Sequence, residues 1–181
     1  MTYQKQVTEF LSDIIEQYEK GKRLADRAIA QVSDDDLFRT LDSEANSVAL
    51  LMKHMAGNML SRWTDFLTSD GEKADRNRDT EFIITDENSR EQLTAYWNSG
   101  WQVTLDALKA LTIDDLSKTI YIRQEPHSVI RAINRQFGHY SYHIGQIVML
   151  AKYFAGDKWE SLSVPRGQSE EFNRMMLSKL K

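Results

Sequence analysis

Two of the four histidines in this chain lie four residues apart, in the segment His139-Tyr-Ser-Tyr-His143. On an α-helix this spacing places both imidazoles on one face, about one turn apart. At that separation two ring nitrogens can reach the same metal ion, which makes the pair the strongest chemical feature of the sequence. A histidine at the edge of a core is more often a packed residue with satisfied hydrogen bonds, so a purely structural role stays open.

The segment from Ser128 to Phe154 is predicted to be the helix that carries this pair. Its apolar residues recur at intervals of three and four, as in a helix with one face on a core. Pro126 lies just before the helix, where its missing N–H is tolerated, and Gly156 follows as a candidate C-cap. Both histidines fall at one edge of the apolar stripe. The stripe consists of Val129, Ile133, Phe137, Tyr140, Ile144, Ile147, Ala151 and Phe154.

A third histidine, His54, lies in a second predicted helix from about Asn46 to Leu67, beside its apolar face. A helical bundle could bring this residue opposite His139 and His143. Three neutral imidazoles suit a divalent first-row ion such as zinc or nickel. Three protein ligands also leave coordination positions open to water or substrate, as in catalytic zinc sites.

Other polar residues near these ligands allow two interpretations. Ser47, Asn58 and Asp65 form a row at helical spacing, which is either a solvated edge or the wall of a cavity. The fourth histidine, His127, follows a proline at the start of a helix. We interpret it as a surface or capping residue and not as a metal ligand.

Two further long helices are predicted, from about Thr2 to Gln31 and from Ser89 to about Leu111. Ser89-Arg-Glu-Gln92 is a capping-box pattern, and Gly100 among aromatic residues indicates a close contact between helices. A short last helix is expected from Ser169 to Leu180. The tail that precedes it should lie along the bundle through three apolar anchors, which are Trp159, Leu162 and Val164.

The segments between the helices predict the topology. From Thr68 to Asn88 the sequence is mostly polar, and about twenty residues are more than adjacent antiparallel helices need, so we predict a long crossover. The connectors Asp35–Leu41 and Asp114–Ile120 resemble each other weakly, which suggests two helix pairs. We therefore predict an all-α four-helix bundle, with a long crossover between helices two and three and a short C-terminal helix.

Composition bounds the class of protein. Over 181 residues, 41% are hydrophobic and 28% charged, as expected for one folded domain spanning residues 1–181. The net charge of −4 argues against general affinity for nucleic acid. The chain has no cysteine, which excludes disulfides, thiolate ligands and a cysteine nucleophile. With no apolar leader and no stretch near the roughly 20 apolar residues of a membrane span, we expect a cytoplasmic protein without membrane association.

The helix order, the segment Leu-Met-Lys-His54-Met-Ala-Gly-Asn58 and the His139-x-x-x-His143 spacing resemble the DinB/YfiT-like superfamily of metal-binding four-helix bundles. The ending from Trp159 to Phe172 resembles a bacterial branch of unknown function. The resemblance covers most of the chain and implies that His54, His139 and His143 are metal ligands. Members include bacillithiol S-transferases, mycothiol-dependent isomerases and proteins with no known reaction. Many are dimers, so we expect a homodimer.

These observations favour a metal-dependent enzyme that acts on a small molecule, by thiol transfer or hydrolysis, with a small-molecule substrate or a thiol cofactor as its partner. A histidine-bound dication with an open position can lower the pKa of water or of a thiol. The sequence singles out no general base. Asp65, Tyr142 and Arg135 lie near the ligands in sequence, and we interpret them as supporting or surface residues.

The alternative is a metal- or ligand-binding bundle without turnover, with a role in sensing, storage or protein interaction. A polar cavity beside the open coordination position would favour the enzyme, and a blocked position would favour the binding bundle. A third interpretation is a purely structural bundle in which the histidines are incidental.

Overall fold

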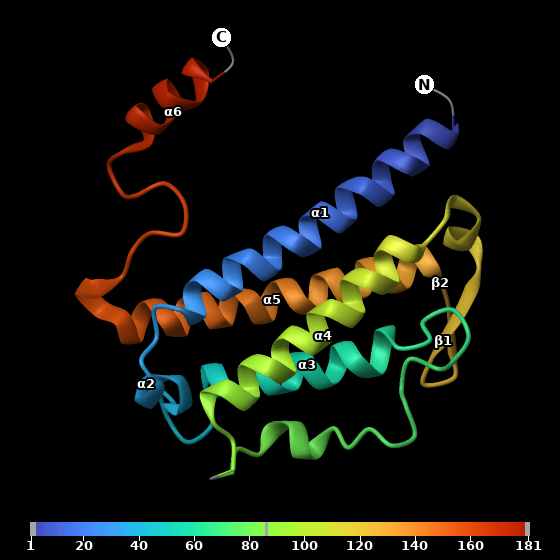
Figure 1. The fold of residues 1–181 in the computed structure, drawn as a ribbon, viewed down its shortest axis with the longest axis horizontal. Coiled ribbons are helices and arrows are strands. Elements are labelled where there is room, and N and C mark those ends of the chain that lie inside the picture. The colour runs from blue at the N-terminus through green and yellow to red at the C-terminus, as the bar shows by residue number, and fades with distance from the viewer. Residues whose placement is uncertain (1–2, 86, 180–181) are drawn as a thin grey trace.

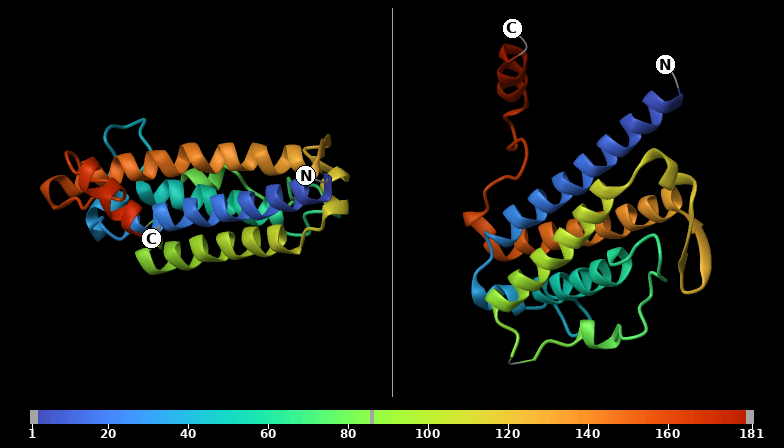
Figure 2. Two further views of the ribbon diagram at one scale, coloured as in Figure 1. Left: turned by 90° about the horizontal axis from the view of Figure 1, so that it is seen from above. Right: turned by 45° about the vertical axis from the view of Figure 1, so that its right-hand side comes forward.

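A computed structural model describes residues 3–85 and 87–179, and four long helices form a bundle within them (Figure 1). The four helices lie side by side in the two further views as well (Figure 2). This confirms the predicted all-α class, and the predicted helices differ from the observed ones only at their ends. Thr2 and Leu180, which the predictions included, lie outside the described residues. The long helices are α1 (Tyr3–Ile29), α3 (Val48–Trp63), α4 (Arg90–Ala110) and α5 (Val129–Ala155).

The long crossover sets the directions of the helices. It spans residues 64–89, contains the 3-10 helix η1 (Asp79–Phe82) and packs on α3. Because it carries the chain back to the end where α3 began, α3 and α4 run in the same direction (Figure 1). The main packing partners are α3 with α4 and α1 with α5. The predicted crossover between the second and third long helices is therefore confirmed.

The two connectors that resemble each other in sequence also resemble each other in structure. The first contains the short helix α2 (Asp34–Phe38), and the second begins with the 3-10 helix η2 (Ile113–Ser117). Each buries one leucine of the shared pattern, Leu37 in the first and Leu116 in the second. The two connectors therefore divide the chain into two pairs of successive helices, as predicted, but these are not the packing pairs, because α3 packs mainly on α4 and α1 on α5.

The second connector then forms a β-hairpin that the sequence analysis missed. Strand β1 (Thr119–Ile122) pairs antiparallel with β2 (Glu125–Ser128). Its turn places Arg123 and Gln124 at φ values of 55° and 65°, where glycine or asparagine is usual. Without those residues the sequence carries no strong hairpin pattern. Pro126, predicted to precede the helix directly, therefore belongs to β2.

Three local predictions are confirmed: two at helix ends and one at a contact between helices. Ser89 and Gln92 form the predicted capping box of α4, and Gly156 is the C-cap of α5 with a φ of 53°. A Cβ on Gly100 would lie 3.0 Å from the Cα of Ala56. This glycine therefore permits the close approach of α4 to α3.

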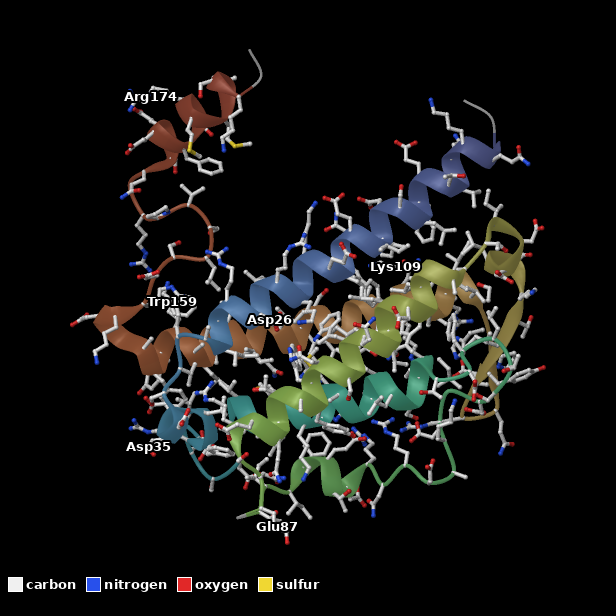
Figure 3. All side chains as sticks on the ribbon, in the orientation of Figure 1. Asp26, Asp35, Glu87, Lys109, Trp159 and Arg174 are labelled. Atoms are coloured by element: carbon white, nitrogen blue, oxygen red, sulfur yellow. The ribbon has the colours of Figure 1, made fainter. Side chains whose placement is uncertain are left out.

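The C-terminal part leaves the bundle. Trp159 and Leu162 pack against the core as predicted, and Val164 is partly buried. The last helix, α6 (Ser169–Ser178), buries none of its residues and stands away from the bundle with its side chains, including Arg174 (Figure 3). Among the described residues, no helix is both long and apolar enough to cross a membrane.

Candidate metal centre

Helices α3 and α5 bring His54, His139 and His143 into one cluster. One ligand nitrogen of each ring lies within 4.8 Å of the other two. The Nε2 atoms of His139 and His143 are 3.2 Å apart, as expected for rings one helical turn apart. The ring centre of His54 lies 5.0 Å from that of His143 and 5.5 Å from that of His139. The structure thus joins the three residues that the sequence analysis selected.

These distances are close to those of a metal site. Zinc–imidazole bonds of about 2.0–2.1 Å at tetrahedral angles separate two ligand nitrogens by about 3.3 Å. The nitrogens of His139 and His143 already have this separation, at 3.2 Å. The cluster is therefore compatible with three imidazole ligands on one ion.

Glu81, in η1 of the crossover, fixes the tautomer of His54. Its Oε2 lies 2.9 Å from His54 Nδ1. A carboxylate can only accept a hydrogen bond, so Nδ1 carries a proton, which leaves Nε2 as the nitrogen that can bind a metal ion. Arg76 donates to both oxygens of Glu81, at 2.8 and 2.9 Å. Burial alone would raise the pKa of Glu81, but the hydrogen bonds from His54 and Arg76 hold it below its usual value.

Gly57 provides the space that Glu81 occupies beside α3. A Cβ at this position would lie 2.6 Å from Glu81 Oε1. The sequence analysis missed Glu81, because a glutamate within a polar crossover matches no pattern. Gly57, three residues after His54 on the same helix, is the sequence feature that could have indicated a close neighbour there.

Gln146 fixes the tautomer of His143 in the same way. Its Oε1 lies 2.8 Å from His143 Nδ1, so this nitrogen carries the proton and Nε2 keeps a lone pair. On the third ring, His139 Nδ1 is buried and has no hydrogen-bond partner within residues 3–85 and 87–179.

Neither tautomer of a neutral His139 ring satisfies both of its nitrogens. If Nε2 carries the proton, it donates to His143, and a lone pair on Nδ1 is buried without a donor. If Nδ1 carries it, the Nε2 lone pairs of both rings face each other at 3.2 Å. A cation between the Nε2 atoms removes the second conflict, so the residues present fit a metal ion.

Electrostatics keep these ligands in the form that binds metals. Burial lowers the pKa of His139 to about 3, and the electrostatic influence of the neighbouring His143 and His54 rings adds to the effect. Burial likewise lowers the pKa of His143 to about 4, against the opposing hydrogen bond of Gln146. Both rings are therefore neutral at pH 7, as metal ligation by imidazole requires.

A cavity of about 490 Å³ lies beside His54 and His139. The rings of Phe82 and Tyr142 flank the cluster, with centroids 4.6 Å from that of His54 and 4.3 Å from that of His143, respectively. The cavity is large enough for a small molecule. Its other lining residues are Asn58, Arg62, Arg76, Arg78, Arg123, Asn134, Arg135, Gln136, Gly138 and Tyr142.

A buried polar network joins α3 to α5 next to this cavity. Gln136 Nε2 donates to Asn58 Oδ1 at 2.7 Å, and Tyr140 Oη donates to the same oxygen at 3.1 Å. Trp63 Nε1 donates to Tyr140 Oη at 3.0 Å. Burial raises the pKa of Tyr140 to about 12, so the phenol remains a neutral donor. The network fixes α3 against α5, and with them His54 against His139.

The other polar residues that the sequence analysis singled out lie in different parts of the structure. Ser47 is the N-cap of α3, Asn58 lines the cavity, and Asp65 is exposed beyond the end of the helix. The polar row therefore contributes one residue to the cavity wall. Tyr142 and Arg135, which the sequence analysis did not favour as site residues, both line the cavity.

The interpretation of His127 as a surface or capping residue is wrong. Its side chain lies in β2 and is 4% exposed. It turns inward because β2 pairs with β1, which places alternate residues against the bundle. The residue is outside the three-histidine cluster, and its Nε2 lies 3.3 Å from Arg135 Nη1.

Fold and cluster together define an α-helical bundle with three convergent histidines beside a polar cavity. A family described as proteins of unknown function, DUF1572, matches residues 5–168, and the chain belongs to this family. A comparison with curated proteins finds no match. Because the family description names no reaction, function has to be argued from the site.

Proposed function

We propose that the Nε2 atoms of His54, His139 and His143 hold one divalent transition-metal ion, such as zinc or nickel. In this proposal the protein is a metal-dependent enzyme that acts on a small molecule. The helix order and the three histidine positions support membership of the DinB/YfiT-like superfamily. The thiol-dependent members of that superfamily make S-transfer the first reaction to test and hydrolysis the second.

The cavity beside His54 and His139 is the observation that carries the enzyme proposal. Three protein ligands leave coordination positions for a small ligand, as in catalytic zinc sites, and the cavity of about 490 Å³ can hold one. A bundle that only stores or senses a metal needs no such space beside the ion. The alternative function, a binding bundle without turnover, is therefore the second candidate.

A dication in this site supplies Lewis acidity, which makes water or a thiol easier to deprotonate near neutral pH. The protein residues supply geometry: Glu81 holds the Nδ1 proton of His54, and Gln146 holds that of His143. Partial burial raises the pKa of Tyr142. This phenol therefore stays protonated at neutral pH and can donate a hydrogen bond to a substrate in the cavity.

Elemental analysis tests the metal directly, on protein purified without a histidine tag and without added metal. We expect about one equivalent of a divalent transition metal per chain. Metal-loaded and chelator-stripped protein are then compared for S-transfer from low-molecular-weight thiols and for hydrolysis of small esters and amides. Turnover by the loaded form alone supports the enzyme. A full metal complement without turnover supports the binding bundle, and metal at trace level rejects both.

We also propose a homodimer in the cytoplasm, where a chain without cysteine is compatible with the reducing conditions. The exposed side chains of α6 include four large apolar residues, which offer an apolar surface beyond the bundle. Light scattering at micromolar concentration should give twice the chain mass of 21.0 kDa, and a monomer alone would contradict the dimer. The four residues are Phe172, Met175, Met176 and Leu177.

A further inference from the structure

Five arginines converge on the cavity beside the histidines, although the chain as a whole carries a net charge of −4. They come from four separate elements: α3, the crossover, the turn of the hairpin and α5. The described residues that line the cavity include no aspartate or glutamate. We call these five residues the arginine cluster: Arg62, Arg76, Arg78, Arg123 and Arg135.

Carboxylates behind the cavity neutralise only part of this charge. Glu72 contacts Arg62 at 2.8 Å and both Arg76 and Arg123 at 3.2 Å. Glu81 pairs with Arg76. A third carboxylate, that of Asp70, accepts hydrogen bonds from the backbone of the hairpin turn. Among the described residues, the five guanidinium groups thus form ion pairs with only two carboxylates, those of Glu72 and Glu81, which leaves a positive surplus at the cavity.

Arg78 and Arg135 carry that surplus, because neither forms an ion pair in the part of the chain that the structure describes. Each is instead oriented by an aromatic ring. The Arg78 guanidinium lies over Phe82, 5.7 Å from the ring centre. Arg135 Nη1 lies 3.3 Å from Nε2 of the buried His127, to which it can donate. These contacts position the two cations without cancelling their charge.

Guanidinium groups bind carboxylate and phosphate through paired, charge-assisted hydrogen bonds. We propose that the cavity binds the oxyanion group, a carboxylate or phosphate, of a small molecule, with Arg78 and Arg135 as its principal contacts. The rest of the molecule then lies toward the histidines. The anion site itself rests only on the arginine cluster, whereas its meaning as a substrate site rests on the proposed function.

The chemistry is tested by calorimetric titration of the full-length protein with three probes at constant ionic strength. Inorganic phosphate and malonate represent the two oxyanions, and malonamide is a neutral molecule of similar size to malonate. We expect one of the two anions to bind at least about tenfold more tightly than malonamide. The tighter anion identifies the source as phosphate or carboxylate. If neither anion binds better than malonamide, the inference is overturned.

Variants then locate the site. Arg78→Gln and Arg135→Gln should each weaken binding of the preferred anion about tenfold. Arg131→Gln is the matched control: it lies one turn before Arg135 on the same helix, is exposed and does not line the cavity. It should weaken binding less than about twofold. Unchanged binding in the first two variants, or an equal loss in Arg131→Gln, contradicts the proposed contacts.

Metal content separates this inference from the proposed function. The titration is run on metal-loaded and chelator-stripped protein, and both arginine variants should retain the metal content of the parent. If the protein as purified carries only trace metal, and its anion binding depends on Arg78 and Arg135, the anion site is supported and the metal-dependent enzyme is rejected. Full metal content with anion binding indifferent to both arginines rejects the anion site alone.

Discussion

The histidine and arginine clusters border the same cavity but are built in different ways. Every histidine of the cluster comes from a long helix, and two of them come from one turn of α5. The arginines come from two helices, the crossover and a hairpin turn. Metal ligation needs nitrogens held to a few tenths of an ångström, which rigid helices provide. Recognition of an anion by long charged side chains tolerates the looser placement that loops allow.

The largest expected effect concerns the histidine cluster and the metal ion proposed to bind there. Replacement of His54, His139 or His143 by Ala should reduce metal affinity more than about 100-fold, because two imidazoles and water make a much poorer site. His127→Ala should leave metal affinity nearly intact, since its ring lies outside the cluster. Metal competition titrations measure both. Parental affinity in His54→Ala would show that the three-histidine site is wrong.

A core substitution next to the histidine cluster should lower stability far more than a substitution in the arginine cluster. Ile144 is 5% exposed, and its Cδ1 packs against Gly21 of α1. Ile144→Ala and Phe137→Ala should each lower the free energy of unfolding by about 2–5 kcal/mol. Arg78→Gln, an exposed change in the arginine cluster, should shift it by less than about 0.5 kcal/mol. Urea unfolding of chelator-stripped protein provides the values, and an Ile144→Ala protein as stable as the parent would refute the packing argument.

Glu81 is where the crossover reaches the histidine cluster, so its replacement tests whether the two regions are independent. Glu81→Gln removes the charge that holds the His54 tautomer, and metal affinity should fall roughly 10- to 100-fold. Glu72→Gln is the control, because the Glu72 carboxylate pairs with arginines of the cluster and, among the described residues, with no histidine. Equal metal affinities of the two variants would mean that Glu81 does not position the ligand.

A separate effect is the pH dependence of stability in the metal-free protein. The folded state lowers the pKa of His139 to about 3 and of His143 to about 4, against about 6.5 in an unfolded chain. Between these values the unfolded chain binds more protons than the folded one. The contribution of these two histidines to the free energy of unfolding should therefore be fully present above about pH 6.5 and decrease as the pH drops through this window.

Unfolding of stripped protein in urea at several pH values checks this dependence. The slope between about pH 6.5 and pH 4 should shrink when His139 and His143 are both replaced by Gln. Arg78→Gln should keep the parental slope. In the metal-loaded protein, protons compete with the ion for the same nitrogens, so metal should dissociate as the pH falls below the usual imidazole range.

Much of the fold and the histidine cluster could be predicted from local patterns. The four-residue spacing of His139 and His143 fixes their shared face, because the period of a helix does not depend on its surroundings. Apolar periodicity likewise identified the four long helices, and the length of the polar segment after α3 indicated the crossover. His54 required one further step, since a bundle brings the edges of its helices together.

The tertiary structure alone decided the rest of the site. Glu81 reaches His54 across 27 positions of sequence, and the arginines converge from segments without periodicity. His127 is buried because β2 turns it inward, in a hairpin whose turn residues take left-handed φ values without glycine. Periodic patterns report which residues share a face of one element. They do not report which loop folds over which helix, because that depends on contacts between residues distant in sequence, whose free energy no single segment contains.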